Sequence, residues 1–161
     1  MAMKSYNILF LCTHNSARSI IGEALASTHP SGKFKGFSAG STPGTSVNPI
    51  AADIVAELGM DRALLKSKSW DVYGQPDAPK MDFVITVCDN AAGEQCPFWP
   101  GQPSTAHWGF PDPSQVQGTE LEKRHAFNDV MNGLKRRLDI MASMPLDKLD
   151  SMSLKAIHTQ V

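Results

Sequence analysis

The sequence lacks an excess of charge of either sign. Its 161 residues include 15 Lys and Arg against 16 Asp and Glu, which gives a formal net charge of −1 at pH 7. There is no run of basic residues, so the charge pattern does not favour binding to nucleic acid or to a membrane surface. Any site for an anion must therefore be built locally, from a few residues.

Long apolar runs are also missing. The stretch ILFLC (residues 8–12) is too short for the core of a signal peptide, and no stretch reaches the length of a transmembrane helix. We therefore expect no membrane association and a cytoplasmic protein whose thiols are kept reduced. No surplus apolar stripe is left over for an interface, which favours a monomer.

Cysteine is scarce and lacks paired spacing. The chain has three, Cys12, Cys88 and Cys96, with no Cys-x-x-Cys motif, which argues against a disulfide framework and against a zinc ribbon. Composition alone predicts three small buried apolar residues. The histidines show no metal-ligand spacing, so we commit to no metal site.

Strands and helices alternate along the chain, as judged from apolar runs, amphipathic periodicity and capping residues. The predicted strands are residues 6–12, 33–40, 82–88 and 105–110. The predicted helices are residues 19–28, a helix from Pro49 stopped by Gly59, and a long helix that begins at Thr119 and ends before Pro145. This alternation predicts an α/β fold with a parallel, doubly wound sheet. We assign residues 1–145 to one domain and residues 146–161 to a C-terminal tail that can hold a short helix.

Two of the three cysteines come at the ends of predicted strands. Cys12 ends the first strand, and Cys88 ends the strand at residues 82–88. In open parallel sheets, ligands bind beyond the carboxyl ends of the strands. Both thiols are therefore expected at the functional edge of the sheet, which their interpretation as buried apolar residues does not predict.

The segment CTHNSARS (residues 12–19) combines the parts of a site for a tetrahedral oxyanion. A strand that passes through a short polar loop into a helix directs backbone N–H groups and the positive helix end at one centre. Arg18 adds a planar fork for two oxygens, and the same field is expected to convert Cys12 into a nucleophilic thiolate. Ser19 is placed to donate a hydrogen bond to that sulfur. The predicted oxyanion-binding residues are Thr13, His14, Asn15, Ser16, Ala17 and Arg18.

Four motifs, in this order, resemble those of arsenate reductases built on the low molecular weight tyrosine phosphatase fold. They are CTHNSARS, SAG (38–40), VITVCDNAAGEQC (84–96) and HWGFPDP (107–113). The resemblance covers the chain from about Tyr6 to the long C-terminal helix. It implies a single α/β domain with a central four-stranded parallel sheet flanked by helices on both faces. It also implies arsenate as the substrate, a role in arsenic detoxification, and no tightly bound cofactor.

The resemblance further implies roles for the thiols and for Asp112. Reduction of arsenate to arsenite takes two electrons, which two thiols supply when they form a disulfide. Cys12 would attack arsenic, and Cys88 would then attack Cys12 and release arsenite. Cys96 would take over the disulfide and pass it to thioredoxin, or to glutaredoxin with glutathione. Asp112 corresponds to the general acid that protonates the leaving oxygen.

Some members of this family bind potassium near the loop. The corresponding places here are Asn15, Glu23, Ser38 and Asp71, while Lys68 offers a positive charge in place of an ion. The sequence leaves this potassium site open.

One loop residue departs from the family pattern, because His14 stands where many relatives carry glycine. If that position requires a positive φ, histidine is strained there, although histidine and asparagine tolerate this conformation better than most residues.

Two other functions compete with arsenate reduction. A low molecular weight protein tyrosine phosphatase would use Cys12, Arg18 and Asp112 and would need no relay of thiols. Phosphatases of this fold usually place tyrosines after the Asp-Pro pair, whereas Ser114 and Gln115 follow it here. In a non-catalytic module that captures arsenite or senses redox state with three thiols, the arginine and the acid would be superfluous.

Overall fold

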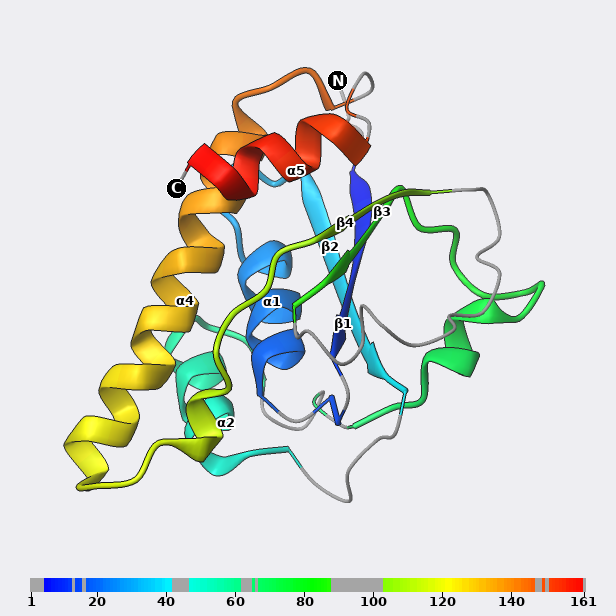
Figure 1. Cartoon of the computed structure of the whole chain (residues 1–161). Helices are drawn as coiled ribbons and strands as arrows, with labels where there is room; N and C mark the ends of the chain where they lie inside the picture. The colour runs from blue at the N-terminus through cyan, green and yellow to red at the C-terminus, as the bar shows by residue number, and fades with distance from the viewer. Residues whose placement is uncertain are drawn as a thin grey trace.

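The structure is a computed structural model that describes residues 5–12, 14–15, 17–41, 47–61, 65, 67–87, 103–146, 149 and 151–160. Figure 1 shows the arrangement of its α-helices and strands, and the chain also contains 3₁₀ helices (η). The elements are β1 (Tyr6–Cys12), α1 (Arg18–Ser27), β2 (Phe34–Gly40), α2 (Pro49–Glu57), η2 (Trp70–Gly74), β3 (Phe83–Thr86), β4 (Ser104–His107), η3 (Pro113–Gln115), α4 (Glu120–Ala142) and α5 (Ser151–Gln160).

Four parallel strands form the centre of the fold, in the order β2-β1-β3-β4. The register pairs Cys12 with Gly40 on one side of β1 and Leu11 with Thr86 on the other. Because all strands run in one direction, their carboxyl ends meet at a single edge. The predicted four-stranded parallel sheet flanked by helices is confirmed: residues of α1, α2, α4 and α5 pack in one core cluster, and η2 packs in the cluster on the other face.

The side chains of β1 alternate between two layers of core. Ile8 and Phe10 belong to the cluster formed with α1, α4 and α5, whereas Leu9 and Leu11 pack with η2 on the opposite face. All four are fully buried, as expected for a strand covered on both faces. The sequence analysis did not predict η2, because a helix of five residues is too short to show a periodic pattern.

Several element ends follow from their capping residues. The Asn48 side chain accepts hydrogen bonds from the backbone N–H groups of Ile50 (2.9 Å) and Ala51 (3.4 Å), and Pro49 is the first residue of α2, as predicted. At the start of α4, Thr119 and Glu122 form a reciprocal capping box.

Two strands are shorter than predicted. The observed helices begin and end within a few residues of the predicted bounds. In contrast, β3 already ends at Thr86 and β4 at His107. Beyond these ends, backbone pairing continues without regular strand geometry. The N–H of Trp108 donates to the Thr86 carbonyl at 2.7 Å, and that of Phe110 donates to the Val87 carbonyl at 3.1 Å.

Helix α5 packs on the same core as α1 and α4. Its Leu154 and Ile157 are buried, and the indole Nε1 of the fully buried Trp108 donates to the Leu154 carbonyl at 2.9 Å. Residues of the segment 146–161 thus contribute to the core beside β4. None of the helices in the described ranges has the length and apolar character needed to cross a membrane.

We expect Gly36→Ala to lower the free energy of unfolding by about 1–3 kcal/mol. A Cβ at this position in β2 would lie 2.2 Å from the backbone oxygen of Glu23 in α1, which cannot move aside as a flexible side chain can. Urea unfolding followed by circular dichroism measures the change. Lys35→Ala, at the exposed neighbouring position, serves as the control and should change stability by less than about 0.5 kcal/mol. Equal midpoints for both variants would contradict this close contact between β2 and α1.

Candidate active site

Cys12 lies at the carboxyl edge of the sheet, where it is the last residue of β1 and only 5% exposed. Helix α1 begins at Arg18, and its N-cap residue Ala17 provides no side-chain hydrogen bond. The first N–H groups of α1 are therefore not satisfied by a side-chain cap, and they carry the positive end of the helix dipole. An uncapped helix end therefore follows Cys12 closely in the chain, as the predicted oxyanion site requires. Thr13 and Ser16 lie outside the described residues.

Asn15 connects the loop to a distant segment of the chain. It is fully buried, and its side-chain Oδ1 accepts from the N–H of Lys68 at 2.8 Å. Its backbone carbonyl accepts from Ser67 Oγ at 2.8 Å, and its Nδ2 donates to Ser19 Oγ at 2.9 Å. The sequence analysis did not predict the contribution of Ser67, which lies 52 residues away and belongs to no recognised motif.

The left-handed position of the loop falls at Asn15 and not at His14. Within the described ranges, Asn15 is the only non-glycine residue with a positive φ, at 51°. Asparagine is among the residues that adopt this conformation most readily. The strain considered for His14 therefore does not arise there, and His14 is exposed.

Ser19 is fully buried at the start of α1. Its hydroxyl accepts the hydrogen bond from Asn15 Nδ2, which leaves the Ser19 hydrogen available for donation to another acceptor. Its donation to the sulfur of Cys12 stays a prediction.

The Arg18 guanidinium has a fixed orientation. Its Nη1 donates to the carbonyl oxygen of Phe110 at 2.7 Å, and its Nη2 lies 3.7 Å from Asp112 Oδ2. The Nε atom is buried and has no hydrogen-bond partner among the described residues. A buried N–H without an acceptor is costly, so Nε indicates a position where an oxyanion oxygen would be stabilised.

Asp112 is the N-cap of η3 and faces Arg18. Its Oδ1 accepts from the backbone N–H of Ser114 at 2.9 Å and from Ser114 Oγ at 2.7 Å. Partial burial tends to raise the pKa of the Asp112 carboxyl, but the hydrogen bonds from Ser114, the positive charge of Arg18 and a hydrogen bond from Gln115 together hold it below the usual value. Asp112 is therefore a carboxylate at neutral pH in the free protein.

A cluster of three polar side chains includes Glu23, Ser38 and Lys68. Ser38 Oγ donates to Glu23 Oε1 at 2.5 Å, and the Lys68 ammonium lies 3.7 Å from the same oxygen. Asp71, also considered for a cation site, is instead exposed and lies in the first turn of η2, where its backbone N–H donates to the hydroxyl of the N-cap residue Ser69 at 3.2 Å. In the described part of the chain, no three His, Cys, Asp or Glu side chains converge on a common point.

Cys88 and Cys96 both lie outside the described residues. The residue before Cys88 is described, and its position bears on the predicted relay. The N–H of Val87 donates to the carbonyl of Leu11 at 2.9 Å, so the residues that precede Cys88 and Cys12 are hydrogen-bonded neighbours.

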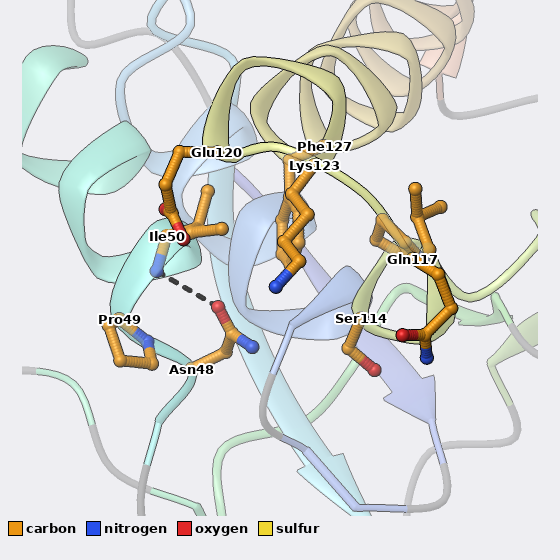
Figure 2. A pocket seen from close by; sticks show the side chains of 10 residues that line it. Asn48, Pro49, Ile50, Ser114, Gln117, Glu120, Lys123 and Phe127 are labelled. Atoms are coloured by element: carbon orange, nitrogen blue, oxygen red, sulfur yellow. Dashed lines mark hydrogen bonds between the residues drawn. The ribbon is translucent and has the colours of Figure 1, made fainter.

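A recess of about 400 Å³ adjoins the Asp112 loop, between the start of α2, η3 and the first turns of α4 (Figure 2). The Lys123 side chain points into it towards Asn48 and Ser114. Among the described residues that line it, Phe127 is the only aromatic one. The remaining wall carries several polar side chains, from Asn48, Ser114, Gln117, Glu120 and Lys123.

Comparisons with known proteins agree with this fold and site. Residues 7–151 match the family described as low molecular weight phosphotyrosine protein phosphatase. The chain is 35% identical over 136 residues to an arsenate reductase of Bacillus subtilis (strain 168), a match that covers 84% of this chain and 94% of the relative.

Solved structures extend these comparisons. An arsenate reductase in its oxidized state is 25% identical, with a TM-score of 0.65 and coverage of 85% of this chain and 96% of that one. A tyrosine phosphatase from Erwinia amylovora shares the fold at 22% identity, with a TM-score of 0.56 and coverage of 81% and 87%. One fold thus serves proteins named for two different activities.

We expect Ser114→Ala to raise the pKa of Asp112, because the change removes one of the hydrogen bonds that stabilise the carboxylate. A carbon NMR titration of the Asp112 carboxyl checks the direction. Since the pKa is lowered in the folded state, ionised Asp112 stabilises the fold above its unfolded-state pKa of about 3.9. This contribution is lost as the pH falls through the folded-state pKa.

Acidification below about pH 4 should therefore cost the wild type more stability than Asp112→Asn. Urea unfolding across this range measures the difference. Asp77→Asn, at an exposed position, is the control. A constant stability difference between wild type and Asp112→Asn at all pH values would contradict the lowered pKa.

Proposed function

The chain belongs to the low molecular weight phosphotyrosine protein phosphatase family, and we propose that it reduces arsenate to arsenite with Cys12 as the nucleophile. The observation that carries the proposal is the arrangement of Arg18 at the carboxyl edge where Cys12 ends β1. Its Nη1 is anchored on Phe110, its Nη2 faces Asp112, and its Nε lacks a partner among the described residues. The similarity to a Bacillus arsenate reductase over most of both chains supports arsenate rather than an aryl phosphate as the substrate.

Arsenate binding uses donors from two sources. The uncapped start of α1 directs backbone N–H groups at the oxyanion, and the unpartnered Nε of Arg18, together with the Nη2 that faces Asp112, binds its oxygens. The bound anion draws the Arg18 charge away from Asp112 and adds negative charge nearby, and both effects raise the pKa of that carboxyl. Asp112 then accepts a proton that the protonated arsenate brings and transfers it to the leaving oxygen.

The first chemical step forms a bond between Cys12 and arsenic. The Cys12 thiolate attacks arsenic, and one arsenate oxygen leaves as water after it has received the proton from Asp112. This step exchanges one ligand of arsenic for another and does not yet reduce it. The product is an adduct in which arsenic is held by the Cys12 sulfur and by the oxyanion donors of the loop.

The second step is the reduction. The Cys88 thiolate attacks the Cys12 sulfur, the S–As bond breaks with its electron pair moving to arsenic, and arsenite leaves. Cys96 then attacks Cys88, which frees Cys12 and moves the disulfide to the Cys88–Cys96 pair. The hydrogen bond between Val87 and Leu11 supports the first disulfide, because each cysteine is one residue away from a paired position and a disulfide needs Cα atoms within about 7 Å.

An external thiol must return the relay to its starting state. We propose thioredoxin, or glutaredoxin with glutathione, as the donor of two electrons to the Cys88–Cys96 disulfide. Such chemistry fits the cytoplasm, where thiols are kept reduced, and a monomer suffices because every proposed group comes from one chain.

Replacement of Cys88 tests the relay. In an assay that couples arsenate reduction to NADPH consumption through a thioredoxin or glutaredoxin system, Cys88→Ser should reduce turnover by roughly a thousandfold, because no thiol remains to attack Cys12. Any hydrolysis of para-nitrophenyl phosphate, which needs only the shared nucleophile, arginine and acid, should remain within about twofold of wild type.

Replacement of Cys96, together with the assays of arsenate reduction and aryl-phosphate hydrolysis, distinguishes the relay from the alternative functions. Arsenate reduction by Cys88→Ser at the wild-type rate would show that the relay is wrong. Full activity of Cys96→Ser would show that an external thiol acts on an earlier intermediate. A wild type that hydrolyses aryl phosphate but never reduces arsenate would favour the phosphatase, and one that only retains arsenite would favour a binding module.

We also propose that the Lys68 ammonium takes the place of a potassium ion. Glu23 and Lys68 have side chains that are only 11% and 14% exposed, and a buried carboxylate requires a cationic partner. Lys68 provides that charge at 3.7 Å from Glu23 Oε1, while its backbone N–H supports Asn15 in the loop. Lys68 thereby compensates the buried charge of Glu23 and stabilises the position of Asn15 in the oxyanion loop.

Arsenate reduction by the wild type should therefore be the same, within about twofold, in potassium chloride and in tetramethylammonium chloride at equal ionic strength. Lys68→Met should lower the free energy of unfolding by roughly 3 kcal/mol, since it leaves Glu23 buried without its partner. Potassium should restore part of this loss by binding in place of the ammonium. Lys80→Met, at an exposed position, is the matched control. A wild type that requires potassium for activity would overturn the assignment.

A further inference from the structure

Phe110 connects three parts of the molecule through its backbone and its ring. Its N–H donates to the Val87 carbonyl at 3.1 Å, next to the chain position of Cys88. Its carbonyl oxygen accepts from Arg18 Nη1 at 2.7 Å, and Asp112 follows two residues later. The position of the Phe110 peptide therefore determines how Arg18 is directed at the site.

The ring of Phe110 is held against helix α4. A Cβ on Gly133 would lie 2.6 Å from the Phe110 Cε1 atom, so only glycine allows the ring to approach the helix this closely. One turn further along α4, the Arg137 guanidinium lies over the ring at 4.8 Å from its centroid. The ring thus packs against Gly133 and beneath a cation.

Arg137 is an unusual residue for this position, because it is charged and only 6% exposed. Its Nη1 donates to the Gly133 carbonyl at 2.7 Å, which fixes the plane of the guanidinium relative to the helix. Burial of the charge lowers the pKa of Arg137, with a further contribution from the neighbouring Arg136. A helix that needed only apolar packing here would be better served by leucine or methionine.

We propose that Arg137 is a positioning residue for the oxyanion site, which keeps the Phe110 carbonyl in place and through it orients Arg18. The guanidinium of Arg18 is planar, so a fixed acceptor for Nη1 sets the direction of Nε and Nη2 as well. If the ring of Phe110 shifted on α4, the carbonyl would shift with it, and neither the unpartnered Nε nor the Nη2 that faces Asp112 would keep its direction toward the loop. The inference rests on the proposed function, in which those donors bind arsenate.

The test compares Arg137→Met with Arg136→Met, a matched control at the exposed neighbouring position of the same helix. The probe is inorganic phosphate, a tetrahedral oxyanion that binds without any redox chemistry, with its Kd measured by titration calorimetry. Arg137→Met should raise this Kd by about tenfold, a typical effect of coupled neighbours, and Arg136→Met should leave it within about twofold. Arg137→Lys keeps the charge but loses the planar group, so it should weaken phosphate binding too, and it gives the same test should Arg137→Met fail to fold.

A second measurement separates positioning from a merely structural role. In a Cys88→Ser, Cys96→Ser background Cys12 is the single thiol, and its pKa follows from the pH dependence of alkylation by iodoacetamide. Arg137→Met should raise that pKa when Arg18 is present and should have no further effect when Arg18 has been replaced by methionine. The same rise in both backgrounds, or an unchanged phosphate Kd in a folded Arg137 variant, would overturn the proposal. Neither readout needs arsenate reduction, so failure of the proposed function would be seen separately, in the coupled assay.

Discussion

The hydrogen bond from Arg18 Nη1 to the Phe110 carbonyl joins two segments that are 92 residues apart. Arg18 begins α1, and Phe110 leads into the loop that carries Asp112, so this bond brings the cation and the carboxylate to 3.7 Å. Because one anchored nitrogen orients a whole planar guanidinium, the oxyanion site depends on how the segment after β4 packs as much as on the loop after β1. Correct packing of Phe110 on α4 is therefore a condition for the proposed chemistry of Cys12 and Arg18, which lie near the other end of the chain.

Charges buried around the site are paired one by one. Glu23 lies against Lys68, Asp112 against Arg18, and Arg137 against an aromatic ring and a helix carbonyl. Such pairing offsets much of the cost of burial and leaves the protein without a large field of either sign. The positive potential for an oxyanion comes from donors left over after these pairs have formed, which explains how a chain with a net charge of −1 can build an anion site.

The scaffold itself is compatible with both phosphoryl transfer and arsenate reduction. Both need a thiolate, an arginine and an acid at the carboxyl edge of a parallel sheet, and function is set by what is added to this site. In the proposed relay the addition is a second cysteine, Cys88, which follows Val87 in the chain, and the N–H of Val87 bonds to Leu11 beside Cys12. Ser114 and Gln115 follow the Asp-Pro pair, where a phosphatase of this fold is expected to carry tyrosines, which favours the same function.

The sequence by itself determined the parallel sheet and predicted an oxyanion site in the Cys12–Ser19 segment, because apolar runs and residues close together in the chain leave a local pattern. The family resemblance also indicated Asp112 as the general acid, and the sequence suggested Lys68 as a charge in place of an ion. Only the tertiary structure decided that Asn15, not His14, takes the left-handed conformation, and that the Phe110 carbonyl anchors Arg18. The partner of Arg18 could not be predicted, because a hydrogen bond to a backbone atom many residues away does not depend on which amino acid supplies that atom.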